Sequence, residues 1–230
     1  PSWVTPESCE IITLSHPHQD GVAALRAVAD AIGAPKEGAV AQWDQSPLPN
    51  GELNAITMGQ IVARLLPADA IISEEAATTG RGLTQFLPGA KPHDMLYLMG
   101  GSIGQALPLA TGAAIAAPDR KVVTISGDGG AMYTLQSLWT QAREKLDVVT
   151  IICANRRYAI LDLELTRVGA GNAGPKALSM LDIGNPDLDW VALARGMGVE
   201  ADRARDCAEF ARAFEDAMKH KGPRLIEAVL

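Results

Sequence analysis

The sequence lacks the features that mark nucleic-acid-binding and membrane proteins. Its 20 lysine and arginine residues form no run or stripe, and 27 aspartate and glutamate residues bring the net charge to −7. Because binding to a nucleic-acid backbone needs clustered basic side chains, we expect no nucleic-acid partner. Gly, Pro or a charged residue interrupts every apolar run well short of the roughly 18 residues that a membrane span needs, so we expect no membrane partner.

Cysteine is scarce as well. The three cysteines, Cys9, Cys153 and Cys207, are odd in number, and their spacings fit no disulfide or zinc pattern. No signal peptide is recognisable at the N-terminus, so a reducing cytoplasm is the expected compartment. Cys153 lies in an apolar segment, where a thiol behaves as a small hydrophobic group.

The remaining composition, 47% apolar, is sufficient for a substantial core. From about residue 52, short apolar segments alternate with helical patterns. The expected strands are residues 70–73, 122–126, 148–154 and 225–229, and the expected helices are 57–66, 104–117, 135–144, 189–197 and 206–220. Fully apolar strands that alternate with helices predict an α/β fold with an open, mostly parallel sheet and helices on both faces.

The N-terminal part differs from this pattern. Residues 20–32 have the spacing of an amphipathic helix, and residues 34–51 contain three prolines and are typical of a linker. We therefore expect two domains, residues 1–50 and 51–230. His16 and His18 are expected in an exposed loop and Trp139 in the core. The glycine-rich stretch 167–186 is expected to be a long loop, either a lid or a disordered excursion.

The clearest chemical motif follows the expected strand 122–126. Gly127 and Gly129 allow a tight turn, and Gly130 leads into a helix whose N-terminus favours anions. Asp128 would repel a phosphate there unless a cation lay between them. The motif therefore suggests a metal-bridged diphosphate, with a plain strand–helix turn as the alternative; no Lys-Ser/Thr follows, so it is not a P-loop.

Asn155 ends the next expected strand, 27 positions after Asp128. Adjacent parallel strands would place both side chains at the same edge of the sheet. Carboxylate, amide and carbonyl oxygens are ligands that Mg²⁺ prefers. The alternative is that Asn155 only caps or turns the chain.

Gly127-Asp128-Gly129 followed by Asn155 resembles the signature of thiamine diphosphate (ThDP)-dependent enzymes. The segments 100–108 and 72–80 extend the resemblance, and residues 128–161 are similar to benzoylformate decarboxylases and, more closely, to acetolactate synthase large subunits. The resemblance covers about residues 51–230. It departs from the pattern at Ala154, where the signature usually has a first Asn.

The resemblance implies a role for each matching residue. Asp128 and Asn155 would bind Mg²⁺ through their side chains and Arg157 through its carbonyl. The diphosphate would adjoin Gly127, Gly129, Gly130, Thr78 and Tyr158. The carbonyl of Gly101 would accept a hydrogen bond from the aminopyrimidine, and Ile103 would hold the two rings of the cofactor in a bent arrangement. Thr78 as an ordinary loop residue, Ile103 as core and Tyr158 as a packing residue remain alternatives.

The resemblance also implies that this chain is one half of an active site. In the family, a Glu on a separate pyrimidine-binding domain activates the cofactor, and Glu74 and Glu75 do not match that role. We therefore expect a fragment or subunit of a longer protein, partnered by a pyrimidine-binding domain and forming a homodimer or homotetramer. By the same resemblance, Asn54 stands where benzoylformate decarboxylases carry a catalytic His. We therefore expect a 2-keto acid other than benzoylformate as the substrate, with aliphatic acids among the candidates; N-capping of the next helix is the alternative reading of Asn54.

Three functions are therefore candidates. The favoured one is decarboxylation of a 2-keto acid, with or without carboligation, using ThDP and Mg²⁺. The second is a non-catalytic ThDP-binding or regulatory module. A nicotinamide-dependent dehydrogenase is disfavoured, because no G-x-G-x-x-G follows the first strand.

Overall fold

A computed structural model describes residues 6, 8–38 and 40–230. The chain divides into two compact units, Pro1–Val40 and Ala41–Leu230. In the first unit, α1 (Gly21–Ala31) begins at Asp20, whose carboxylate accepts a hydrogen bond from the Ala23 amide. The rings of His16 and His18 stack, and both residues are exposed as expected.

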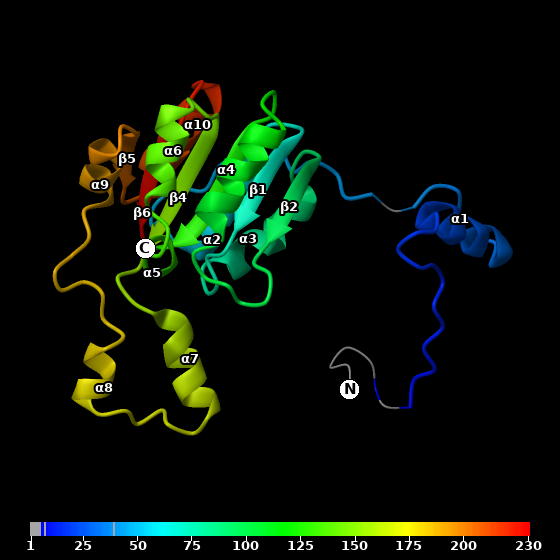
Figure 1. The fold of residues 1–230 in the computed structure, drawn as a ribbon, viewed down its shortest axis with the longest axis horizontal. Coiled ribbons are helices and arrows are strands. Elements are labelled where there is room, and N and C mark those ends of the chain that lie inside the picture. Colours follow the sequence, from blue (N-terminus) through cyan, green and yellow to red (C-terminus); the bar gives the residue numbers. More distant parts are fainter. Residues whose placement is uncertain (1–5, 7, 39) are drawn as a thin grey trace. The chain divides into compact units, whose positions relative to one another are not determined.

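The second unit is built on a sheet of six parallel strands in the order β2-β1-β3-β4-β6-β5 (Figure 1). The strands are β1 (Ala70–Glu74), β2 (His93–Tyr97), β3 (Val122–Gly127), β4 (Val148–Ala154), β5 (Glu200–Ala204) and β6 (Arg224–Val229). All residues of β1 and β4 are buried. The predicted α/β class with helices on both faces is therefore confirmed.

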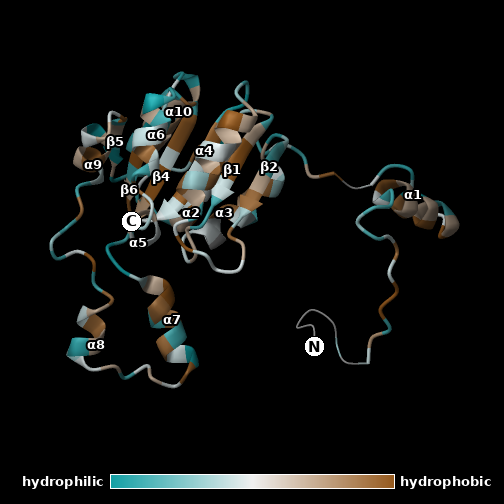
Figure 2. Ribbon diagram, in the orientation of Figure 1, coloured by the Kyte–Doolittle hydropathy of each residue, from teal (hydrophilic) through white to brown (hydrophobic). Residues whose placement is uncertain are grey.

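Successive side chains of each strand point to opposite faces, and each face has its own apolar core. Val123, Ile125 and Ile151 pack with α2 (Ala55–Leu65), α3 (Gly80–Phe86) and α10 (Cys207–Lys219). The other face is covered by α4 (Ala106–Ala116), α5 (Asp128–Ala131), α6 (Ser137–Arg143) and α9 (Trp190–Gly196). Strands β1 and β4 and much of α4 are accordingly among the more apolar parts of the ribbon (Figure 2).

Several elements differ from the sequence-based expectation. Strands β2 and β5, helix α3 and the 3₁₀ turn Leu87–Gly89 were not predicted. The expected loop 167–186 contains α8 (Pro175–Ser179), and α7 (Ala159–Arg167) precedes it. The prediction that Trp139 is a core residue is wrong: 53% of it is exposed, because Leu138 takes the inward position on α6. Cys153 is buried as predicted.

The segment that precedes α2 in the second unit, residues 41–50, packs on the rest of that unit. The Asp44 amide donates a hydrogen bond of 2.8 Å to the Gly89 carbonyl. The Trp43 ring is contacted by Arg64 and Lys91 at 4.7 and 4.6 Å. These contacts make residues 41–50 part of the second unit. Among the residues the structure describes, no helix is long and apolar enough to cross a membrane.

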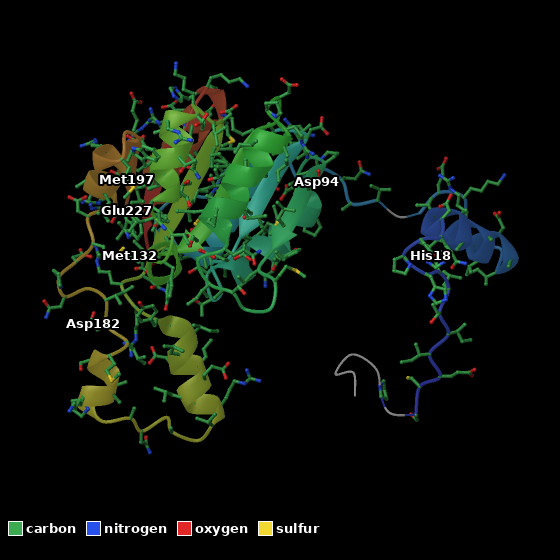
Figure 3. The ribbon with its side chains drawn as sticks, in the orientation of Figure 1. His18, Asp94, Met132, Asp182, Met197 and Glu227 are labelled. Atoms are coloured by element: carbon green, nitrogen blue, oxygen red, sulfur yellow. The ribbon has the colours of Figure 1, made fainter. Side chains whose placement is uncertain are left out.

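The carboxyl ends of the strands all lie at one edge of the sheet. Helices α7 and α8 project beyond this edge (Figure 1). Neither helix has a buried residue, so they form an excursion from the body of the unit. Figure 3 labels Met132, directly after α5, and Asp182, on the segment that returns from α8. In open parallel sheets, ligands bind beyond this edge.

Candidate cofactor-binding site

A pocket lies at the carboxyl edge of the sheet, where three loops meet. Its lining consists of residues 75–79 after β1, 127–130 after β3, and Asn155 with 157–160 after β4, together with Ile103. The structure thereby brings together most of the residues expected to contact cofactor or metal: Thr78, Ile103, Gly127, Asp128, Gly129, Gly130, Asn155, Arg157 and Tyr158.

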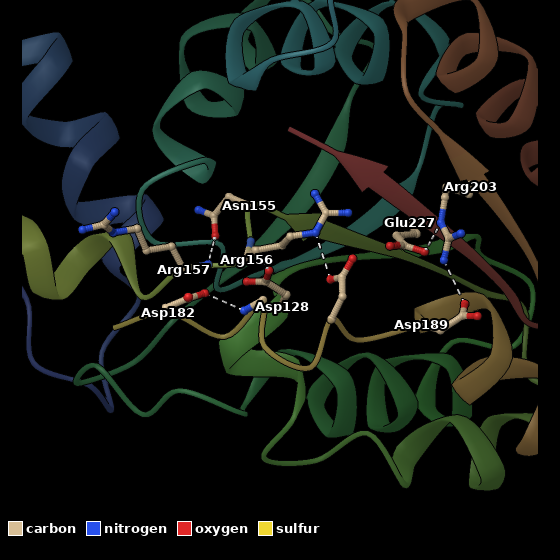
Figure 4. Close-up of polar contacts among 10 residues, drawn as sticks. Asp128, Asn155, Arg156, Arg157, Asp182, Asp189, Arg203 and Glu227 are labelled. Carbon is tan, nitrogen blue, oxygen red and sulfur yellow. Dashed lines mark hydrogen bonds and ion pairs between the residues drawn. The ribbon is translucent and has the colours of Figure 1, made fainter. Parts of the chain in front are cut away.

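Asp128 is the first residue of α5, and its carboxylate is buried, with 3% of the residue exposed. It accepts hydrogen bonds from the backbone amide of Gly129 at 2.9 Å and from that of Arg156 at 2.6 Å. Figure 4 labels Asp128 and Arg156. Burial raises the pKa of Asp128 above its ordinary value, and the bonds from the Arg156 and Gly129 amides lower it in part. A buried carboxylate at this position is favourable if a cation compensates its charge.

Asn155 follows β4 and lies on the neighbouring loop, as its position after an adjacent parallel strand predicts. Its side-chain oxygen accepts a hydrogen bond from the Arg157 amide at 3.0 Å. The next residue, Arg156, has a left-handed backbone with φ 56°. This conformation turns the chain sharply after the strand, so that Arg157 and Tyr158 also line the pocket.

Gly129 is required by the packing of this loop. A Cβ atom built on Gly129 would lie 2.3 Å from Cε1 of Tyr158, well inside contact distance. The aromatic ring therefore rests directly against the glycine backbone. Gly130 is less crowded, since its nearest side-chain atom would be Oε1 of Glu75 at 3.3 Å. A peptide backbone without Cβ atoms offers its amides to a close ligand.

The donor set of the pocket fits a hard cation. Among the described residues, no group of three or more His, Cys, Asp and Glu side chains could hold a metal ion. The candidates at the pocket are instead the Asp128 carboxylate, the Asn155 amide oxygen and a backbone carbonyl, which suit Mg²⁺. Of the charged side chains that line the pocket, Glu75 and Asp128 are acidic, while Arg157 is basic and paired with Asp162. An anionic diphosphate would need a cation here.

Glu75 is a pocket residue that the sequence interpretation did not assign. It is 3% exposed, and its carboxylate accepts hydrogen bonds from the Ala106 amide at 2.9 Å and the Ser126 hydroxyl at 2.5 Å. It thereby joins the ends of β1 and β3 to the beginning of α4. Burial also raises the pKa of the neighbouring Glu74. The sequence feature that could have identified Glu75 is the pair of acidic residues, Glu74 and Glu75, at the end of a buried strand.

Gly101 and Asn54 are not among the residues that line the pocket. Gly101 has φ 73°, and its carbonyl accepts a hydrogen bond from the Ile103 amide at 2.9 Å. Asn54 caps α2 by accepting bonds from the amides of Ile56 and Thr57, while the Thr57 hydroxyl accepts from the Asn54 amide. Asn54 is therefore the N-cap of α2, and its role toward a substrate stays a prediction. Ile103 is 45% exposed, so its reading as a core residue is wrong.

Comparison with known proteins shows which family this chain belongs to. Residues 76–228 match the model of the thiamine pyrophosphate enzyme C-terminal TPP binding domain, and the chain belongs to this family of ThDP-dependent enzymes. It is 47% identical over 232 residues to the Mycobacterium tuberculosis protein that carries the name acetolactate synthase large subunit IlvX, a match covering 100% of this chain and 45% of that protein.

Two further relatives are decarboxylases. Benzoylformate decarboxylase of Pseudomonas aeruginosa is 35% identical over 177 residues, which cover 77% of this chain and 32% of that enzyme. The structure of the ThDP-dependent 4-hydroxybenzoylformate decarboxylase of Rhodococcus jostii RHA1 superposes with a TM-score of 0.70 at 28% identity, covering 89% of this chain and 38% of that one. The chain thus spans between about a third and a half of the length of these relatives.

Proposed function

We propose that this chain supplies the diphosphate-binding half of a ThDP- and Mg²⁺-dependent 2-keto acid decarboxylase or carboligase of the acetolactate synthase type. The observation that carries the proposal is the buried Asp128 carboxylate beside Asn155, in a pocket that belongs to a ThDP-binding domain. A buried anion that faces a diphosphate site is stabilised when a divalent cation lies between the two.

Each side of the pocket has a proposed task. Bound Mg²⁺ would be held by Asp128, Asn155 and the carbonyl of Arg157. The diphosphate would be held by Gly127, Gly129, Gly130, Thr78 and Tyr158. The carbonyl of Gly101 would accept a hydrogen bond from the aminopyrimidine, and Ile103 would support the two rings. Bound ThDP supplies a carbon nucleophile and an electron sink for loss of CO₂ from a 2-keto acid. The chain contributes anchoring, orientation and, through Ile103 and Ile160, exclusion of water.

The second half of the site is proposed to come from a pyrimidine-binding domain, in the same protein or in another subunit of a homodimer or homotetramer. Helix α4 supports this proposal, because its 11 residues include no charged side chain. A helix that is apolar all round is normally buried, yet Ile115 is 60% exposed, and Trp139 on α6, a helix that contacts α4, is 53% exposed. A partner surface would cover this face.

The substrate is proposed to be a 2-keto acid other than benzoylformate. Asn54 stands where the resemblance to benzoylformate decarboxylase implies a catalytic His. An amide does not titrate near neutral pH, so Asn54 cannot transfer the protons that a histidine transfers. Its side-chain oxygen is also engaged with two backbone amides of α2.

The test uses the intact protein, meaning this chain together with the domain or subunit that completes the pocket. ThDP binding is measured by titration calorimetry with Mg²⁺ and with a chelator, and aliphatic and aromatic 2-keto acids are then assayed with identification of the products. We expect Mg²⁺-dependent binding and turnover of an aliphatic acid. Binding without turnover of any 2-keto acid would indicate a non-catalytic module instead.

A further inference from the structure

The loop that follows β4, residues 155–158, contains the proposed metal ligands Asn155 and Arg157. Arg156 lies between them in the left-handed backbone region, with φ 56°. Its amide donates to Oδ2 of Asp128 at 2.6 Å, and its carbonyl accepts from the Ile183 amide at 3.0 Å. One residue therefore joins the loops after β3 and β4 to the segment that returns from α8.

The side chain of Arg156 makes a further connection. Its Nε atom donates to Oδ1 of Asp187 at 2.8 Å (Figure 4). The hydrogen bond from Arg156 holds the pKa of Asp187 below its usual value, so this carboxylate is charged at neutral pH. The two residues are 31 positions apart in the sequence.

Asp187 lies close in sequence to Asp189, which is bonded to both helix α9 and strand β5. Asp189, two residues later, caps α9 by accepting from the Ala192 amide, and it also pairs with Arg203 of β5 at 2.8 Å. Arg203 in turn pairs at 2.7 Å with Glu227 of β6, which is 1% exposed. The return segment is thereby anchored to the sheet close to the residue that Arg156 contacts.

The intervening excursion does not provide such an anchor. Helices α7 and α8 have no buried residue. The connections at its base are Arg156–Asp187, the two backbone bonds from Ile183 to Arg156 and from Tyr158 to Leu181, and the bridge Arg157↔Asp182. The position of the loop 155–158 depends on this base, because a left-handed backbone at a non-glycine residue persists only where its surroundings impose it.

We propose that the Arg156–Asp187 ion pair is a positioning clasp for the metal-binding loop, and that it sets the affinity of the site for Mg²⁺ without contacting the ion. The inference rests on the proposed function of Asp128 and Asn155 as metal ligands. The clasp holds Arg156 so that its amide remains on the Asp128 carboxylate while Asn155 and the carbonyl of Arg157 face the pocket.

Because the ion pair is exposed, its effect on Mg²⁺ binding can be distinguished from an effect on the stability of the fold. The Arg156 and Asp187 side chains are 42% and 54% exposed. Ion pairs this open contribute little to the stability of the whole fold. Groups that orient metal ligands from outside commonly change metal affinity about 10-fold or more. Loss of the clasp should therefore weaken Mg²⁺ binding while the melting temperature stays nearly constant.

The test compares Arg156→Gln, Asp187→Asn and the double variant in the intact protein. ThDP binding is titrated against Mg²⁺ by calorimetry, and amide hydrogen exchange is measured over residues 155–158 without ligands. Lys219→Gln is the control, since it removes an exposed pair with Glu215 at 2.9 Å on α10. In both single variants we expect the apparent affinity for Mg²⁺ to be roughly 10-fold lower, and the amides of residues 155–158 to exchange faster.

The double variant should be no weaker than either single variant, because both remove the same interaction. Arg156→Lys should recover part of the affinity, and the control should match the wild type. The proposal would be overturned if both single variants kept the wild-type affinity for Mg²⁺ and the wild-type exchange rates. It would also be overturned if the losses of Mg²⁺ affinity in the two single variants added up in the double variant. If the wild-type protein bound ThDP without Mg²⁺, the proposed function would fail, while the exchange data would still decide whether the clasp holds the loop.

Discussion

The contact between Gly129 and Tyr158 leads to a quantitative prediction for Gly129→Ala. The added methyl group would lie 2.3 Å from Cε1 and 2.8 Å from Cδ1 of the tyrosine ring. Ordinary contact between carbon atoms needs more than 3.4 Å, so the ring or the loop must move by about 1 Å. Overpacking of this kind typically costs about 1–3 kcal/mol of unfolding free energy.

The affinity for ThDP should fall with the stability, because Tyr158 and Gly129 both line the pocket. Displacement of the backbone amides by about 1 Å should weaken binding by roughly 10- to 100-fold, which corresponds to about 1.4–2.7 kcal/mol. Urea unfolding of the variant measures the first quantity, and calorimetric titration of ThDP with Mg²⁺ measures the second.

Two further variants make this test specific. Gly196→Ala is the matched control, since a Cβ atom there has no heavy atom within 4 Å, and it should leave stability unchanged or raise it by up to about 1 kcal/mol. Tyr158→Ala should relieve the clash, so the double variant should be less destabilised than the sum of the two single changes. Wild-type stability and affinity in Gly129→Ala would refute the packing argument.

Two other changes are predicted from the same contacts. Asn54→Ala should reduce the unfolding free energy by about 1 kcal/mol in urea denaturation, because it removes the cap of α2, and it should leave ThDP affinity unchanged; a large loss of affinity would show that Asn54 also serves the site. Glu74→Gln should stabilise the protein more at pH 7 than at pH 4. Burial raises the pKa of Glu74 in the folded state above its ordinary value of 4.5. The wild type therefore loses stability as the pH rises from 4.5 through the folded-state pKa, whereas the Gln variant does not. An equal effect of Glu74→Gln at both pH values in urea unfolding would show that this carboxyl group does not titrate abnormally.

The central strands of the sheet were predictable from the sequence. Strands β1, β3, β4 and β6 are mostly apolar and mostly buried, because both of their faces are covered. The strands at the two edges of the sheet, β2 and β5, carry charged residues such as Asp94 and Arg203, and their composition resembles that of loops. Trp139 was misassigned because helical spacing alone does not show which face of α6 turns outward.

The site was predictable to the extent that it is local in the sequence. Residues 127–130 and Asn155 follow strands directly, so their meeting at one edge follows from the topology of a parallel sheet. The positions of Glu75 and of the Arg156–Asp187 pair depend on long-range packing. Glu75 contacts Ser126, 51 positions away, and the two members of the ion pair are 31 positions apart. Periodicity and motif spacing carry no information about such contacts.

The most direct test of the metal-bridged diphosphate is a titration of ThDP into the wild-type intact protein and into Asp128→Asn, each with Mg²⁺ and with a chelator. Asn keeps the size of the side chain but removes the buried negative charge. The account predicts that the wild type binds ThDP when Mg²⁺ is present, and that the variant remains folded but loses at least about 100-fold in affinity. Equal affinity in the variant, or full binding by the wild type in the chelator, would contradict it.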